Sequence, residues 1–236
     1  MVATFGAQAA WAGSTFPLTS ALLRSPQVPV HGDSLQNYLD AVGENIQVGR
    51  DQVVVELLTS GSSSSSYTLQ IELGPTSGHV VGIYDGHRSS PTLVPVFPAF
   101  ASAGWSALLS FRSSPTRVVV SLFNENGSFQ GSATTLGVSG LGIGFYVEGS
   151  AGPVYSQDSR NAGGASQVLF YGGTGVNLGS AWMAAQAEPA APGDRDFADT
   201  ILFLAAQGVC VICPPFTYPL TPVRRATWGD LKLHFH

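Results

Sequence analysis

Charged residues are scarce in this sequence, and their scarcity limits the partners that the chain can bind. They make up 11% of its 236 residues, against about 25% in an average soluble domain. Ten basic residues stand against fifteen acidic ones, the formal net charge is −5 at pH 7, and Lys232 is the only lysine. Because binding to nucleic-acid phosphates needs clustered Lys and Arg, we expect no nucleic-acid partner.

Long apolar runs are missing as well. No stretch approaches the roughly 18 consecutive apolar residues of a membrane-spanning helix, so no transmembrane segment is expected. Residues 1–14 are apolar, but they lack the Lys or Arg that a secretory signal carries ahead of its apolar stretch. We therefore interpret the sequence as a mature or trimmed chain without its export signal.

Cysteine is rare too, since Cys210 and Cys213 are the only two. One pair cannot form a disulfide scaffold for a chain of this length. Two prolines follow Cys213, so a helix cannot begin there as a thioredoxin-like redox site requires. Two free thiols, a local disulfide and half of a zinc site all remain open.

Helical periodicity is confined to one short segment. Leu35, Tyr38, Leu39 and Val42 follow the i, i+3, i+4, i+7 pattern of one helix face, which predicts a helix over about residues 34–42. Asp33 or Ser34 can cap its first turn.

The rest of the chain consists of short β-branched and aromatic runs separated by Gly, Pro, Ser and Asn, which predicts strands. Their short spacing favours an all-β fold, a jelly-roll-like antiparallel β-sandwich with one short helix, over a parallel α/β sheet. The near-continuous apolar runs 118–123 and 200–204 predict strands covered on both faces. The expected strands are 52–58, 67–73, 79–85, 93–97, 105–111, 117–123, 135–138, 142–148, 167–171, 200–205 and 209–213.

Two terminal segments differ from the central part in composition. We divide the chain into an apolar N-terminal arm (1–30), a β-sandwich domain (31–213) and a Pro-rich spacer with a terminal strand (214–236). In the last segment Leu231, Leu233 and Phe235 alternate with polar residues, as in an amphipathic strand. Such a strand can pair with its own sheet or with the sheet edge of a neighbouring copy.

An acidic cluster lies just before the apolar run 200–204. Glu188, Asp194, Asp196 and Asp199 place four of the fifteen acidic residues within twelve positions. Carboxylates ~5 Å apart repel by about 3 kcal/mol at an effective dielectric near 20. A solvated loop tolerates this repulsion, and a hard cation removes it. Oxygen ligands without Cys or His favour Ca²⁺, so the residues alone leave a calcium site and a solvated acidic turn as alternatives.

Several motifs of the chain resemble one bacterial domain family. Gly142-Ile-Gly-Phe-Tyr-Val147, Tyr155-Ser-Gln-Asp-Ser-Arg-Asn161, Gln167-Val-Leu-Phe-Tyr171 and Gly193-Asp-Arg-Asp-Phe-Ala-Asp199 are similar to the motifs of an uncharacterised domain family of secreted bacterial surface proteins. That family reads G-F-Y-L, Y-S-x-x-x-L-N, a V-L-A-Y-like strand, and E-D-L followed by G-D-R-D-[FY]-N-D. The similarity covers residues 142–204, about a quarter of the chain.

The resemblance implies a secreted, calcium-binding domain. Carried over by position, the candidate Ca²⁺ ligands are Glu188, Asp194, Asp196 and Asp199. Pro189 stands where the family has a second acid and Ala198 where it has Asn. The loss of these oxygens implies a weaker site, or one completed by water and backbone carbonyls. For Ser156, Asp158 and Asn161 two alternatives stay open: they belong to a neighbouring loop that packs on the site, or they are ordinary polar groups of a turn.

Catalytic motifs are absent from the sequence: it holds no G-x-S-x-G elbow, no P-loop, no H-E-x-x-H and no strand followed by G-x-G-x-x-G. We therefore expect a non-enzymatic, Ca²⁺-stabilised structural protein that is extracellular or on the cell surface and self-associates through its terminal arms. The alternative is a carbohydrate-binding adhesin module, with Trp11, Trp105, Trp182 or Trp228 as a platform on which a sugar stacks.

Overall fold

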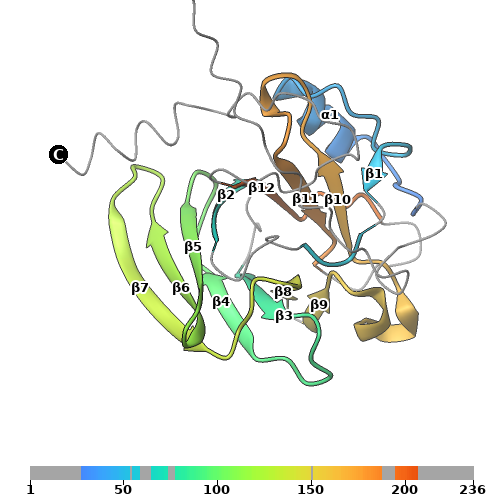
Figure 1. Cartoon of the computed structure of the whole chain (residues 1–236). Coiled ribbons are helices and arrows are strands. Elements are labelled where there is room, and N and C mark those ends of the chain that lie inside the picture. The colour runs from blue at the N-terminus through green and yellow to red at the C-terminus, as the bar shows by residue number, and fades with distance from the viewer. Residues whose placement is uncertain are drawn as a thin grey trace, which may run out of the picture.

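The computed structural model describes residues 28–53, 55–58, 65–73, 78–149, 151–187 and 195–206. In this part of the chain, strands form two antiparallel sheets and one short helix, α1 (Ser34–Ala41), packs on the larger sheet (Figure 1). The predicted all-β, jelly-roll-like antiparallel sandwich with one short helix is confirmed, and its two sheets are unequal in size. No described helix is long and apolar enough to cross a membrane.

The larger sheet has eight strands and the smaller one four. In spatial order the larger sheet consists of β1 (Gln52–Val53), β10 (Val168–Gly172), β11 (Ala181–Ala185), β12 (Thr200–Ala206), β2 (Ser66–Leu73), β5 (Ser106–Ser113), β6 (Thr116–Phe123) and β7 (Phe129–Leu136). The smaller sheet consists of β4 (Leu93–Phe97), β3 (Val80–Asp85), β8 (Ile143–Gly149) and β9 (Gly152–Tyr155). Single turns of 3₁₀ helix lie at Asp158–Arg160, Ala162–Gly164 and Gly175–Asn177.

The main hydrophobic core lies between the two sheets. Alternate residues of β2 from Tyr67 to Ile71 are buried there, with Tyr67, Leu69 and Ile71 all at most 4% exposed. Across the interface Phe145 of the smaller sheet meets Phe170 of the larger one edge to face, with ring centroids 5.8 Å apart. The period-2 alternation of the sequence therefore marks the face of each strand that is removed from water.

A second core covers the opposite face of β10, β11 and β12. Leu35 and Leu39 of α1 are buried there together with Trp182 and Phe203, whose rings pack 4.7 Å apart. Tyr38 and Val42, the other two residues of the predicted helix face, pack against the same core. The apolar run 200–204 is thus covered on both faces, as predicted.

Strand β6 differs from that prediction. Its buried residues alternate, so that Val118 and Val120 face the main core while Val119 and Ser121 are only half-buried. The run 118–123 was expected to be covered on both faces, and this expectation is wrong. Because α1 and its loop cover only the β10–β12 end of the large sheet, valine on the outer face of β6 stays partly exposed.

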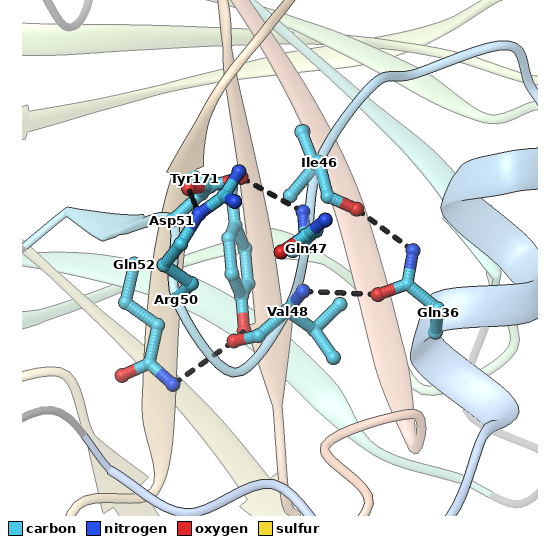
Figure 2. Close-up of polar contacts among 8 residues, drawn as sticks. All are labelled: Gln36, Ile46, Gln47, Val48, Arg50, Asp51, Gln52 and Tyr171. Atoms are coloured by element: carbon cyan, nitrogen blue, oxygen red, sulfur yellow. Dashed lines mark hydrogen bonds and ion pairs between the residues drawn. The ribbon is translucent and has the colours of Figure 1, made fainter.

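The loop from α1 to β1 is held by side-chain amides (Figure 2). Gln36 donates to the carbonyl of Ile46 at 2.7 Å and accepts from the amide of Val48 at 3.0 Å. The carbonyl of Val48 also accepts from Tyr171 of β10 at 3.0 Å and from Gln52 at 3.1 Å. These bonds satisfy backbone groups that no strand pairs, and they fix the loop over the second core.

Several boundaries differ from the sequence prediction. The expected strand 52–58 is reduced to β1 and isolated bridge residues at Val55 and Leu58. β7 begins at Phe129 rather than near 135, and β9 and β11 were not predicted. Asp33 occupies the N-cap of α1 but makes no side-chain capping bond. The expected strand 209–213 lies outside the described residues.

Two tyrosine–glycine pairs hold the smaller sheet together. On its outer face Tyr84 of β3 lies opposite Gly144 of β8, and Tyr146 of β8 lies opposite Gly82 of β3. A Cβ atom at Gly144 would lie 2.1 Å from the Tyr84 ring, and one at Gly82 would lie 2.3 Å from the Tyr146 ring. Each ring therefore packs flat over the glycine of the partner strand and covers its backbone.

Substitution of Gly144 by alanine is expected to destabilise the fold by about 1–3 kcal/mol, because the added methyl overpacks a buried ring. Urea unfolding measures the change. Gly172→Ala in β10 is the matched control, since a Cβ there meets no atom within 4 Å. Equal stability of the two variants would show that Tyr84 does not need the space above Gly144.

Candidate functional site

Two of the four predicted calcium ligands lie in the described part of the chain. Asp196 and Asp199 belong to the segment Arg195–Asp199, which leads directly into β12. Glu188 and Asp194 lie outside the described residues. Among the described residues no group of three or more His, Cys, Asp or Glu side chains is placed to hold a metal ion.

Phe197 fixes this segment, which we call the acidic corner (Arg195–Asp199). Its ring is fully buried in the second core, and its φ of 54° is the only positive value at a non-glycine residue in the described chain. Its amide donates to Oε1 of Gln186 at 3.2 Å. A left-handed conformation at a bulky residue costs of order 1–3 kcal/mol and persists only where the surroundings hold it, so ring burial determines the path of the corner.

The two carboxylates are oriented by backbone amides. Oδ1 of Asp196 accepts from the amide of Ala198 at 3.0 Å, and Oδ2 of Asp199 accepts from the amide of Ala187 at 2.8 Å. The second bond ties the start of β12 to the chain that leaves β11. Within the described chain the other oxygen of each carboxylate accepts no hydrogen bond, so each side chain keeps one oxygen for a further ligand.

Arg195 does not neutralise these carboxylates. Its Nη2 donates to the carbonyl of Ser166 at 3.1 Å, and its guanidinium lies 5.8 Å from the centre of the Phe197 ring. Its Nε is buried and meets no acceptor among the described residues. The cation of the corner is therefore turned away from Asp196 and Asp199.

Ser156, Asp158 and Asn161 lie in the segment between β9 and β10, which contacts the acidic corner. Ser166 connects it to the acidic corner, because its hydroxyl donates to Asp158 at 2.5 Å while its carbonyl accepts from Arg195. Asn161 binds the amide and carbonyl of Tyr155 at 2.7 and 2.8 Å. Ser156 accepts from the amide of Phe145 at 3.0 Å. Ser156, Asp158 and Asn161 thus bind the backbone or side chains of this protein and hold the loop in place.

Arg160 ties the same loop to the turn after β3. Its guanidinium donates to Gln157 at 2.6 Å and to the carbonyls of Arg88 and Ser89, and it lies 5.2 Å from the centre of the Tyr84 ring. Burial raises the pKa of the Tyr84 phenol, and burial raises the pKa of Tyr146 to about 12. Both tyrosines are therefore neutral phenols at physiological pH.

A buried carboxylate that the sequence did not reveal lies at the other end of the second core. Glu44 is 5% exposed and accepts from the amide and hydroxyl of Thr174, both at 2.6 Å, from the indole of Trp182 at 2.8 Å, and from the side-chain amide of Asn177. Four donors on two oxygens satisfy a buried carboxylate without a cation. Glu44 therefore fixes the 3₁₀ turn before β11, and its oxygens are already occupied.

Replacement of Glu44 by glutamine is expected to destabilise the protein by about 2–4 kcal/mol, because an NH₂ group then faces donors in a buried site. Chemical denaturation measures the loss. Glu125→Gln, an exposed change in the turn after β6, is the control and should leave the midpoint unchanged. A Glu44 variant as stable as this control would contradict the assignment of Glu44 as a buried structural acceptor.

The described tryptophans do not form a sugar platform. Trp105 is 8% exposed and Trp182 is fully buried, so neither indole presents a face to solvent. Trp11 and Trp228, the other two candidates, lie outside the described residues, as do Cys210 and Cys213.

Comparison with known proteins gives no relative from which a function can be transferred. No family model and no curated protein matches the sequence. Among solved structures, an alginate lyase from Pseudomonas aeruginosa aligns at 13% identity with a TM-score of 0.13. The alignment covers 68% of this chain and 60% of the lyase. A likeness at this level carries no argument about fold or activity.

Proposed function

We propose that this protein is a non-enzymatic structural protein of the cell surface or the extracellular space, and that Ca²⁺ stabilises it at the acidic corner. Glu188, Asp194, Asp196 and Asp199 supply the side-chain ligands. One observation carries the proposal: buried Phe197 fixes a corner in which Asp196 and Asp199 each keep an oxygen that no described group binds.

The chemistry of the corner supports a hard cation. Arg195 directs its guanidinium to the carbonyl of Ser166 and the Phe197 ring, so its charge is engaged outside the two carboxylates. Ca²⁺ accepts carboxylate and backbone oxygens in a flexible shell of 6–8 ligands. Such a shell tolerates the loss of the two family oxygens at Pro189 and Ala198, with water or carbonyl groups in their place.

A cation bound at the acidic corner would strengthen the connection between β11 and β12, two central strands of the large sheet. Asp199 already links the amide of Ala187, beyond the end of β11, to the first residue of β12. Because β11 and β12 are buried on both faces, loosening their connection exposes apolar surface on two sides. We therefore infer that bound Ca²⁺ raises the stability of the whole sandwich.

Calcium saturation is expected to raise the melting temperature, because a ligand at about 100 times its Kd stabilises the native state by about 2.7 kcal/mol. EDTA should reverse the increase. Asp196→Asn should lower the calcium-dependent part of the stabilisation, whereas Asp33→Asn, at an exposed N-cap without a side-chain bond, should leave it unchanged. A melting temperature that does not respond to Ca²⁺ or EDTA would contradict the calcium proposal.

We further propose that copies of the protein associate through the terminal arms. The alternation of Leu231, Leu233 and Phe235 with Lys232, His234 and His236 supports a strand that can pair with another copy. Deletion of residues 214–236 should then leave smaller assemblies than the full chain forms under the same conditions. Size-exclusion chromatography with light scattering measures this, and an unchanged elution profile would contradict a role of the arm.

A further inference from the structure

Strand β7 forms one edge of the large sheet, and its outer side has no partner strand in the described part of the chain (Figure 1). It is eight residues long and contains neither a charged residue nor a proline. Six of its eight residues are exposed, including Phe129 at 56% and Leu136 at 66%. A long, uncharged, partly apolar edge is a template for pairing with another strand.

The other three sheet edges carry protection that β7 lacks. β1 has only two residues, and β4 holds the exposed Pro95. β9 has four residues and includes Pro153, and the side chain of Asn161 occupies the outer amide and carbonyl of its Tyr155. Short length, proline and capping side chains are the usual devices that prevent edge-to-edge association. β7 has a register shift against β6 near Gln130, but its residues 132–136 carry none of these devices. This stretch of the edge is therefore available for pairing.

The backbone groups that β7 offers follow from its register with β6. The amide of Gly137 binds the carbonyl of Thr116 at 2.8 Å, and Val118 lies opposite Thr135 and Val120 opposite Ala133. In an antiparallel ladder hydrogen-bonded pairs alternate with non-bonded pairs, so Thr135 and Ala133 bond to β6. The amides and carbonyls of Ser132, Thr134 and Leu136 therefore point away from the sheet.

We propose that β7 pairs antiparallel with β7 of a second copy, so that two large sheets join into one. This inference rests on the proposed self-association but assigns it to a contact within the described sandwich. Pairing about a two-fold axis at Thr134 places Thr134 opposite its own copy and Ser132 opposite Leu136, and each pair exchanges two hydrogen bonds. A second copy fits because the strand is self-complementary, since no charge on it repels the same strand turned around.

The size of the edge sets the expected affinity. Eight residues form a small contact beside the roughly 20–30 residues that each partner contributes to a standard interface. We therefore expect a weak, concentration-dependent dimer.

Sedimentation velocity over a dilution series of the full chain tests the proposal. Thr134→Pro removes an outward amide without breaking a bond to β6, and Thr134→Lys adds a charge at the same place. Both variants should associate less than the native chain at the same concentration, because the β7 contact is lost. Thr92→Lys, an exposed site beside β4, is the matched control and should behave like the native chain.

Disulfide trapping tests which strand occupies the edge. In a chain with Cys210→Ser and Cys213→Ser, Thr134→Cys should form a disulfide-linked dimer on mild oxidation. Hydrogen-bonded partners lie ~5.5 Å apart at Cα, which is within the ~4.4–6.8 Å range of disulfides. Thr92→Cys in the same chain should stay monomeric.

Each result supports or overturns the assignment. A native chain that stays monomeric at every concentration overturns it, as does dimerisation that both Thr134 variants retain. Dimers lost in Leu233→Asp but kept in Thr134→Lys would assign association to the terminal arm alone, and the proposed function would stand without the β7 contact. A Leu233→Asp chain that dimerises more strongly than native would show that the terminal strand covers β7 within one copy, which also overturns the assignment.

Discussion

The two-sided burial of β10, β11 and β12 is the constraint on which the rest of the structure depends. These strands lie between the main core and the second core, and every residue of β11 is fully buried. Each element around them has a part in covering these strands. α1 supplies Leu35 and Leu39 to the second core. The side-chain amides of Gln36 and Gln52 bind backbone carbonyls of the loop that lies over this core. Glu44 accepts the hydrogen bond of the Trp182 indole.

The same burial shapes the candidate site. Phe197 enters the second core, and the backbone at this residue adopts a left-handed conformation to allow it. Asp196 and Asp199, which lie before and after the buried ring, are only half-buried, and their carboxylates accept hydrogen bonds from the amides of Ala198 and Ala187. The proposed calcium site is thus a consequence of how β12 enters the sheet, and an ion there would act on the most deeply buried strands.

Cover is uneven across the large sheet, and this has consequences for association. At the end formed by β10–β12 both faces are packed, whereas β6 is buried on one face and β7 is mostly exposed. The exposed end also lacks the proline and short length that protect β1, β4 and β9. The large sheet is packed on both faces at its β10–β12 end and ends in the exposed strand β7 at the other. A further strand can extend such a sheet at the exposed edge.

How much the sequence predicted depended on how local the responsible interactions are. The strand 67–73, the helix face of Leu35 and Leu39, and the covered run 200–204 were predicted correctly, because burial repeats with the period of each element. β11 was missed because, apart from Trp182, its Ala and Met residues do not favour strands. Its neighbours on both sides hold it extended. Most of β7 was missed because its Gly, Ser and Gln residues bury little.

The features of the candidate site likewise fall into those that the sequence determined and those that only the tertiary structure decided. The sequence alone determined that acidic residues gather before the last apolar run, since that is a matter of composition and spacing. It did not indicate Glu44, whose donors come from Thr174, Asn177 and Trp182, more than 125 residues further along the chain. Nor did it show that Arg195 turns away from Asp196 and Asp199. Only the tertiary structure decided these points, because hydrogen bonds and burial of this kind depend on which distant segments the two cores bring together.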